Sequence, residues 1–216
     1  MSWIDDHAPP NGVVIDIGAN QGSLTAQFAD RVGPHGVVYA IEPQRGLRDG
    51  LSALHPAVRV LTMAIGATDG TAMLHLGQQS EHASLYEPNV LAPTGEHEAV
   101  MVRSLDSLQG TGELPSHVDL IKVDTQGAEA AILRGAARLL REARPAWYLE
   151  LWPIGLVGAG AHLGQVRQCL EAAAYVPDGR TWAEIETTCE HYEGHGSMDM
   201  LFLPAERVGP VTATKD

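Results

Sequence analysis

A chain of 216 residues, of which 44% are hydrophobic and 19% are charged, is long enough to bury the core of one domain. Its 27 acidic residues outnumber its 14 lysines and arginines, so the formal net charge is -13. This balance excludes the broad basic surface that binds a phosphate backbone or an anionic membrane. We therefore expect one domain over residues 1–216 that binds neither nucleic acid nor membrane.

Short β-branched segments alternate with segments whose apolar residues recur at helical spacing, and this alternation is typical of a parallel sheet with crossover helices. In the first part of the chain we predict a strand at 13–17, a helix at 23–31, a strand at 36–41, a helix at 47–54 and a strand at 58–63. The dipeptide Asp69-Gly70 then predicts a hairpin turn between two short strands.

The polar segment 75–98 interrupts the alternation, because it contains Pro88 and Pro93 and shows no apolar period. A loop of this length inside a domain is usually functional. Regular elements resume after it, with strands predicted at 100–103, 118–123, 146–151 and 198–203, and helices at 128–141 and 163–173. The tail 205–216 is expected to be frayed.

These elements predict an α/β fold, a three-layer αβα sandwich with helices on both faces of the sheet. In such folds ligands bind outside the carboxyl ends of the strands, where the winding direction reverses. The loop Asp16-Ile-Gly-Ala-Asn-Gln-Gly22 follows the first predicted strand and is therefore expected at that crevice.

Two glycines shape this loop. Gly18 allows a tight turn, and Gly22 allows close approach at the start of a helix whose free N–H groups favour an anion. A dinucleotide-binding loop needs GxGxxG, whereas this one reads DxGxNxG, and we expect the Asp16 carboxylate to repel a diphosphate. Glu42, in AIEP at the end of the second strand, is placed to accept hydrogen bonds from two ribose hydroxyls. These features favour S-adenosylmethionine, although DxG and Glu-Pro also occur in turns that bind nothing.

The two cysteines, Cys169 and Cys189, lie in a predicted helix and a predicted strand, without CxxC spacing. No signal peptide precedes them, so we expect a reduced, cytoplasmic compartment. No apolar run approaches the roughly 20 residues that span a bilayer.

Five segments, VVIDIGANQGSLT, AIEP, MAIGATDGTAMLH, VRSLDSL and DLIKVDTQGAEAAILRGA, together resemble the FkbM family of class I S-adenosylmethionine-dependent methyltransferases. The last segment is the most specific, because many methyltransferase families share the glycine loop. The resemblance implies a Rossmann-like fold with a seven-stranded, mostly parallel sheet whose last strand is antiparallel. It also implies an enzyme that converts S-adenosylmethionine to S-adenosylhomocysteine and methylates hydroxyl groups on secondary metabolites or sugars.

The resemblance also implies which residues bind the cofactor. Met63 and Ala64 match the place where the adenine ring usually rests, and Asp124 and Gln126 match the segment at the methionine side. Many relatives have glutamate where this chain has Gln126, and an amide cannot serve as a base there. The full set is Asp16, Gly18, Ala19, Asn20, Gly22, Glu42, Pro43, Met63, Ala64, Asp124 and Gln126.

Transfer to an aliphatic hydroxyl requires a base late in the reaction, and we consider two candidates. His82 lies in the polar segment 75–98, where histidines are usually solvated. Glu150 ends a buried strand, and its alternative role is to orient the cofactor's ammonium group. Because only about a dozen residues precede the first strand, we expect segment 75–98, with 152–163, to cover the acceptor pocket.

A metal site and two other functions were weighed against this interpretation. His191 and His195 are four residues apart, but the glycines around them favour a turn, so we expect no metal. An NAD-dependent oxidoreductase on the same layered fold is disfavoured by DxGxNxG. A non-catalytic nucleoside-binding module is weakened by the intact glycine loop and Glu42, and it stays open.

Overall fold

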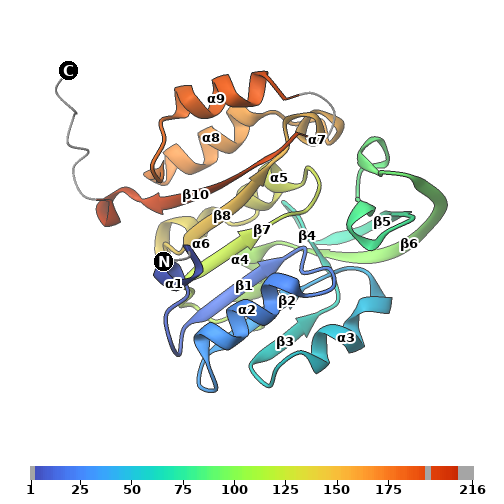
Figure 1. Ribbon diagram of the computed structural model, residues 1–216, viewed down its shortest axis with the longest axis horizontal. Coiled ribbons are helices and arrows are strands. Elements are labelled where there is room, and N and C mark those ends of the chain that lie inside the picture. The colour runs from blue at the N-terminus through green and yellow to red at the C-terminus, as the bar shows by residue number, and fades with distance from the viewer. Residues whose placement is uncertain (1–2, 193–195, 209–216) are drawn as a thin grey trace.

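A seven-stranded sheet forms the centre of the computed structural model, which describes residues 3–192 and 196–208 (Figure 1). Its strand order is β3-β2-β1-β7-β8-β10-β9. In chain order the strands are β1 (Val13–Ile17), β2 (Val37–Ile41), β3 (Val58–Leu61), β7 (Leu120–Val123), β8 (Ala146–Leu151), β9 (Tyr175–Pro177) and β10 (Met198–Pro204).

The winding of the sheet reverses beside β1. The chain passes outward from β1 through β2 to β3 and later returns to place β7 on the other side of β1, with all these pairs parallel. Strand β8 continues the parallel part, and β10 is antiparallel to both of its neighbours. The expected mostly parallel sheet with an antiparallel last strand is thus confirmed, and the reversal puts a crevice at the carboxyl ends of β1 and β7.

Helices cover both faces of the sheet, as the three-layer prediction requires (Figure 1). Successive side chains of a strand point to opposite faces, so Val14 packs in one core with Phe28, while Ile15 packs in the other with Leu133. The helices are α1 (Trp3–His7), α2 (Ser23–Val32), α3 (Arg48–Ala53), α4 (Leu105–Gly110), α5 (Glu129–Arg134), α6 (Ala137–Glu142), α7 (Pro153–Gly158), α8 (Leu163–Ala172) and α9 (Trp182–Glu190). Short 3-10 turns are η1 (Arg45–Leu47), η2 (Ser80–His82), η3 (Glu87–Asn89) and η4 (Ala205–Arg207).

The helix predicted at 128–141 is two helices, α5 and α6. A Cβ on Gly135 would overlap the carbonyl oxygen of Gly66, so the backbone passes close to another segment at this point. The Asp106 carboxylate then accepts hydrogen bonds from the N–H groups of Arg138 and Leu139 at 2.8 and 2.9 Å. Because this carboxylate caps a fresh first turn, a second helix begins here.

A second sheet, which we call the arm, corrects two further predictions. Its strands are β4 (Ala64–Ile65), β5 (Gly70–Gly77) and β6 (Pro93–Arg103), in the order β4-β6-β5. The predicted hairpin at Asp69-Gly70 is wrong, because β4 and β5 each pair with β6 and not with one another. Of the predicted loop 75–98, residues 75–77 and 93–98 belong to β5 and β6, and the segment 78–92, which we call the lid loop, connects these two strands. The first five residues of β6 are all exposed, so this part of the ribbon has no apolar alternation that the sequence could reveal.

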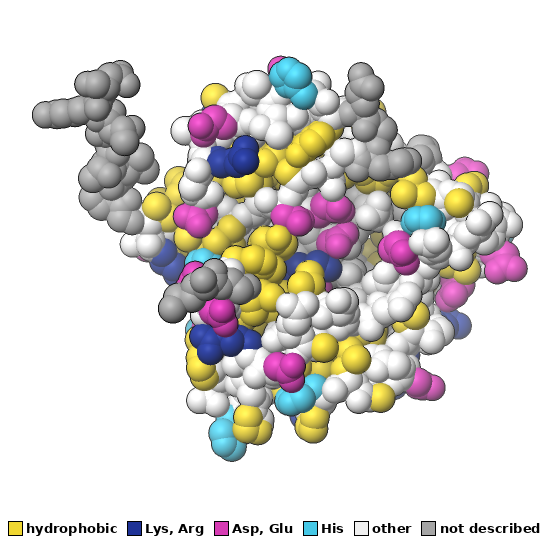
Figure 2. Space-filling model, in the orientation of Figure 1, with side chains coloured by type: hydrophobic (Ala, Val, Ile, Leu, Met, Phe, Trp, Pro, Cys, Tyr) yellow, Lys and Arg dark blue, Asp and Glu magenta, His cyan; other side chains and the backbone are white. Residues whose placement is uncertain are grey.

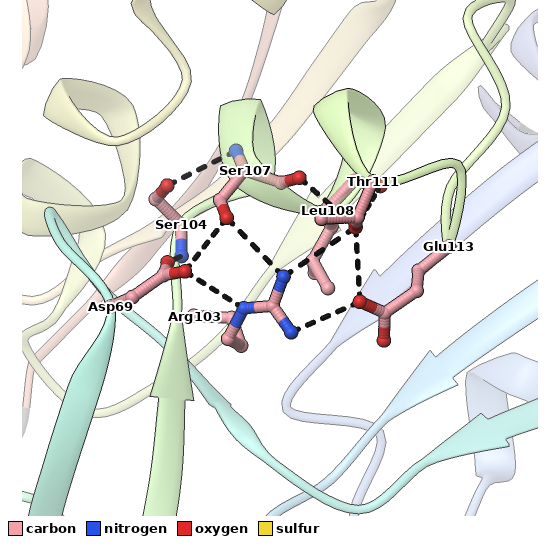
Figure 3. A network of polar contacts seen from close by, with 7 residues as sticks. All are labelled: Asp69, Arg103, Ser104, Ser107, Leu108, Thr111 and Glu113. Atoms are coloured by element: carbon pink, nitrogen blue, oxygen red, sulfur yellow. Dashed lines mark hydrogen bonds and ion pairs between the residues drawn. The ribbon is translucent and has the colours of Figure 1, made fainter.

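Arg103, at the end of β6, ties the arm to α4 (Figure 3). Its guanidinium group lies 3.0 Å from Oδ2 of Asp69 and 3.0 Å from Oε1 of Glu113. Asp69 also accepts hydrogen bonds from Ser104 N at 2.9 Å and Ser107 Oγ at 2.7 Å, and these bonds lower its pKa. The carboxylate therefore stays ionised at neutral pH. Several polar contacts hold the base of the arm to the main body.

Five elements were not predicted from the sequence: α1, α4, α7, α9 and β9. Helix α9 nevertheless carries a recognisable signal, a capping box in which Thr181 and Glu184 bond each other's backbone N–H groups. Cys189 lies in this helix and not in a strand, which corrects the prediction for it, and both cysteines are free thiols. No helix in the described part of the chain is long and apolar enough to cross a bilayer.

Candidate functional site

The crevice at the carboxyl ends of β1 and β7 holds two adjoining hollows. The first, which we call the apolar lobe, has a volume of about 590 Å³ and is lined in part by Ile41, Met63, Ala64 and Leu85. The second, the polar lobe, lies beside the start of α2 and has a volume of about 720 Å³. Both lobes share four lining residues, namely Gly18, Asn20, Glu81 and Asp124. A ligand with an apolar ring at one end and charged groups at the other fits this division.

The glycine loop forms the wall between the two lobes. Gly18 has φ +75°, and a Cβ there would overlap the carbonyl oxygen of Asp124, so the position requires glycine. The N–H groups of Gly18 and Ala19 both donate to the carbonyl of Ile41, at 3.0 and 3.2 Å. Asn20 follows in the left-handed region at φ +48°. A left-handed residue other than glycine costs free energy, and such strain is concentrated at functional sites.

Gly22 serves packing and the start of a helix. Its φ is +86°, and a Cβ would overlap the side chains of Leu51 and Leu54, so the close approach is to α3. As the N-cap of α2, it supplies no side-chain hydrogen bond to the first turn. The start of this ten-residue helix therefore presents backbone N–H groups and the positive end of its dipole beside the polar lobe.

Glu42 is buried at the end of β2 and lines the apolar lobe. Its Oε2 accepts a hydrogen bond from Asn20 N at 2.9 Å, and its Oε1 accepts from Gln44 N at 2.9 Å and Gln44 Nε2 at 3.2 Å. Burial raises the pKa of Glu42, while these bonds favour the ionised form. Oε1 already accepts two hydrogen bonds, whereas Oε2 accepts one and keeps a second lone pair, so Oε2 has acceptor capacity for a ribose hydroxyl.

Asp16 has a different environment from the one expected of it. It is fully buried, accepts a hydrogen bond from Thr25 Oγ1 at 2.6 Å, and lies 3.2 Å from Lys122 Nζ. Lys122 also donates to the carbonyl oxygen of Gly18 at 2.9 Å. Lys122 thus compensates the charge of Asp16. For this reason the prediction that the Asp16 carboxylate repels a diphosphate is not supported by its position. Asp16 instead supports the glycine loop through Lys122.

Acidic residues gather at the edge of the sheet where β7 and β8 end and β10 begins. Figure 2 shows Asp and Glu side chains grouped where Figure 1 places the tips of β7 and β8. The Asp124 side chain is 41% exposed and lies 3.5 Å from Lys122 Nζ. Glu150 accepts a hydrogen bond from Ser197 Oγ at 2.9 Å and a longer one from Gln126 Nε2 at 3.4 Å. Burial, and then the nearby Asp124, raise the pKa of Glu150 to about 8.

The two candidate bases lie in different surroundings. Glu81 and Ala83 line the apolar lobe, whereas His82 between them packs toward the arm, where a Cβ on Gly77 would overlap the Cβ of His82. The buried Nδ1 of His82 has no hydrogen-bond partner within the described residues. The structure therefore does not bring His82 together with the Glu150 cluster.

The other predicted residues divide between the lobes and the lid loop. Pro43, Met63 and Ala64 line the apolar lobe, and Gln126, which was expected at the methionine side of the cofactor, lines the same lobe. The lid loop reaches the glycine loop through Ser80, whose Oγ donates to Asn20 Oδ1 at 2.5 Å. Trp152 is buried, and its ring packs where a Cβ on Gly155 would be.

Sequence reasoning missed several residues that shape this site. Lys122 carried a usable signal, since a lysine inside the apolar run Leu120–Val123 must be paired when buried. Gln44, Ser80 and Asn89 carried none, because polar residues in loops are ordinary. The expectation for His191 and His195 lies partly outside the described residues, since 193–195 are not described, and the same holds for 209–216 of the tail. Within the described residues no group of three or more His, Cys, Asp or Glu is arranged to hold a metal ion.

The donors and acceptors of the crevice fit S-adenosylmethionine. The apolar lobe suits the adenine ring, and the free lone pair on Oε2 of Glu42 suits a ribose hydroxyl. The N-terminus of α2 suits the carboxylate, and the half-exposed Asp124 suits the ammonium and sulfonium charges. The ring, the ribose and the charged groups of that molecule thus each have a counterpart of suitable chemistry.

Comparisons with known proteins identify the family of the chain. Residues 16–177 match the methyltransferase FkbM domain. Methyltransferase FkbM from Methylobacillus flagellatus KT has a similar structure, with a TM-score of 0.53 and 17% identity over 89% of this chain and 44% of that one. A putative rRNA-methylase from Clostridium thermocellum aligns with a TM-score of 0.55 and 9% identity, over 93% of this chain and 90% of that one. Fibrillarin from Aeropyrum pernix, with natively bound S-adenosyl-L-methionine, aligns with a TM-score of 0.51 and 11% identity, over 91% of this chain and 68% of that one.

The chain spans less than half the length of the FkbM structure that it matches. None of the curated proteins compared with the chain matches it. Structural likeness at 9–17% identity shows the fold alone, whereas the domain match covers most of the chain, from the glycine loop to β9. The chain belongs to the FkbM methyltransferase family, whose cofactor is S-adenosylmethionine.

Proposed function

We propose that this chain transfers the methyl group of S-adenosylmethionine to a hydroxyl oxygen of a small molecule, such as a secondary metabolite or a sugar. The observation that carries this proposal is the position of Glu150. It ends β8 beside the crevice, and Ser197 and Gln126 both donate hydrogen bonds to its carboxyl group. Such a group is what proton removal from a hydroxyl requires.

The residues of the site divide the work between binding and proton transfer. When bound, S-adenosylmethionine would supply a methyl group on a positively charged sulfur, whose C–S bond breaks as the hydroxyl oxygen bonds to the methyl carbon, leaving S-adenosylhomocysteine. Glu150 takes the proton that the hydroxyl loses as the oxygen forms its bond to carbon. With its pKa raised to about 8, Glu150 is a stronger base than an exposed glutamate and is still partly ionised near neutral pH. Glu42 and the glycine loop hold the nucleoside, and the lid loop excludes water.

A small acceptor is favoured over RNA by charge. Some of the structural neighbours are named as rRNA methylases, but the likeness to them extends to the fold alone. This chain carries a net charge of -13, and the acidic residues Glu81, Asp124 and Glu150 surround the crevice. A phosphate backbone would be repelled from such a mouth. We also propose a cytoplasmic location, since Cys169 and Cys189 are both free.

Calorimetry tests the cofactor, with S-adenosylhomocysteine and NAD titrated separately into the full chain. We expect the chain to bind S-adenosylhomocysteine and not NAD. Binding of NAD without S-adenosylhomocysteine would support an oxidoreductase. Methyl transfer is then tested by incubating protein and labelled S-adenosylmethionine with an extract of small metabolites and, separately, with RNA. Label in a hydroxyl-bearing small molecule supports the proposal, label in RNA contradicts it, and binding without any transfer indicates a non-catalytic module.

A further inference from the structure

The side-chain amide of Asn89 joins three segments that are far apart in the sequence. Asn89 lies in η3 of the lid loop and is 1% exposed. Its Nδ2 atom donates one hydrogen bond to the carbonyl oxygen of Gln126 at 2.8 Å and another to that of Gly155 at 2.7 Å. Both amide hydrogens are therefore used, one on the loop after β7 and one on α7.

Glycines surround this amide closely. A Cβ on Gly127 would lie 2.5 Å from Asn89 Nδ2, and a Cβ on Gly158 would overlap Asn89 Oδ1. Gly127 also has φ +108°, a conformation that favours glycine. The backbones of the β7 loop and of α7 thus approach the amide as closely as only glycine permits. A buried amide so enclosed is held in one position.

The Gln126 carbonyl is the link between Asn89 and the reacting region. Gln126 is a left-handed residue with φ +56°, so its conformation needs support from its surroundings. Asn89 holds its carbonyl oxygen from one side, and Glu129 Oε1 accepts the N–H of Gly127 at 3.3 Å from the other. With the backbone fixed in this way, the Gln126 side chain reaches Oε2 of Glu150.

The other end of the lid loop is fastened separately. Ser80 Oγ donates to Asn20 Oδ1, and Gln44 Nε2 donates to the Ser80 carbonyl at 2.9 Å. Both partners belong to the cofactor side, since Asn20 and Gln44 bond Glu42. Ser80 thus fastens the lid loop to the nucleoside-binding wall, and Asn89 fastens it to the segment that carries Gln126. A longer hydrogen bond from Ser84 Oγ to the Gln126 carbonyl, at 3.4 Å, supports the second attachment.

We propose that Asn89 is a positioning residue for the acceptor side of the site, which ties the lid loop to Gln126 and α7 and so sets the Gln126 amide against Glu150. This inference rests on the proposed function for its consequence in turnover. That the Asn89 amide fastens three segments together does not depend on which reaction the chain catalyses.

Hydrogen exchange of the full chain without ligand tests the fastening. In Asn89→Ala we expect faster exchange in residues 84–92, 125–128 and 153–159, with the exchange of β1 and β7 unchanged. Thr94→Ala is the matched control, because Thr94 Oγ1 donates to the Leu76 carbonyl and accepts from Glu96 N, two exposed hydrogen bonds within the arm. Unchanged exchange at 125–128 and 153–159 overturns the proposal, and so does equal loosening of the whole chain. If Asn89→Ala does not fold, Asn89→Ser, which keeps one donor, is read in the same way.

Binding and kinetics then separate positioning from general stability. We expect Asn89→Ala to lower kcat/KM for the acceptor about tenfold or more, with the Kd for S-adenosylhomocysteine within about twofold of wild type. Ser80→Ala should show the opposite pattern, with its larger effect on that Kd. Equal loss of cofactor affinity in both variants overturns the proposal. Should the wild-type chain bind no S-adenosylhomocysteine, the proposed function fails, while the exchange experiment still decides the role of Asn89.

Discussion

Lys122 Nζ lies 3.2 Å from Oδ1 of Asp16 in the middle of the sheet, where the two side chains are 5% and 1% exposed. Burial opposes the charge of Lys122, but the carboxylates of Asp16 and Asp124 more than compensate and raise its pKa. The same Nζ donates to the carbonyl of Gly18, so the ion pair connects two adjacent strands to the glycine turn. Asp16 therefore acts on the site indirectly, because it holds Lys122, which in turn holds the glycine turn.

Breaking this pair should destabilise the fold. Lys122→Met leaves the Asp16 carboxylate buried without its cation, and we expect the free energy of unfolding to fall by roughly 3–5 kcal/mol. The double variant Lys122→Met with Asp16→Asn removes both charges and should recover part of that loss. Urea unfolding followed by circular dichroism measures the free energy of unfolding of the double variant and of each single variant. A double variant whose loss equals the sum of the two single losses would show that the charges are not coupled.

Glu42 should control cofactor affinity. In Glu42→Gln an amide NH₂ group faces either Asn20 N or Gln44 N, two donors that the carboxylate now satisfies. We expect the Kd for S-adenosylhomocysteine to rise by about 10- to 100-fold, because a donor is left unpaired and an acceptor for ribose is lost. Calorimetry measures this, with Glu96→Gln on the exposed part of β6 as the charge-matched control. Similar affinities in the two variants would remove Glu42 from the site.

The pKa of Glu150, raised to about 8, predicts a pH dependence of turnover. If its ionised form is the base, kcat should rise with pH and level off above about 8. Glu150→Gln should lower kcat and abolish this limb while leaving the Kd for S-adenosylhomocysteine unchanged. Rate profiles at saturating cofactor provide the measurement. Loss of cofactor affinity in Glu150→Gln would instead assign Glu150 to binding the ammonium group.

The same carboxyl group predicts how stability depends on pH. In the unfolded chain a glutamate has a pKa of about 4.3. In the folded chain the pKa of Glu150 is raised to about 8, and burial raises the pKa of Glu129 to about 7. Between these values the folded state binds more protons than the unfolded state, so the free energy of unfolding should fall as pH rises. Glu150→Gln should make this decline shallower and leave the part due to Glu129. Urea titrations from about pH 5 to pH 9 test it, and an equal slope in both proteins would contradict a raised pKa.

Two glycines with nearly equal φ separate backbone strain from steric overlap. Gly18 (φ +75°) faces the Asp124 carbonyl, whereas Gly112 (φ +78°) has no atom within 4 Å of where its Cβ would lie. Gly112→Ala should cost only the left-handed strain, roughly 1–2 kcal/mol, and leave cofactor binding intact. Gly18→Ala should cost clearly more and also abolish binding of S-adenosylhomocysteine. Thermal unfolding and calorimetry on both variants give the comparison, and equal losses of stability would show that the overlap is relieved without cost.

The amino-acid sequence by itself determined the layered fold, the glycine loop and the acid at the end of β2. These features are local: apolar periods of 2 and 3.6 residues report burial on one face, and Gly18 and Glu42 sit directly after strands. Parallel strands bring their carboxyl ends to one edge, so such residues meet without further information. Local patterns also misled, since the Asp69-Gly70 turn resembles a hairpin although β6 lies between its two flanking strands.

Only the tertiary structure decided which polar groups pair. Asp16 faces Lys122, 106 positions later in the chain, and Asn89 meets Gln126 and Gly155 in a space that glycines leave open. The apolar run around Lys122 indicates that this lysine is buried, but no local signal names its partner, and none distinguishes Asn89 from a solvated side chain. Burial and partner are set by how distant segments pack. The raised pKa of Glu150 has the same origin, since it comes from desolvation and from a neighbouring carboxylate supplied by another strand.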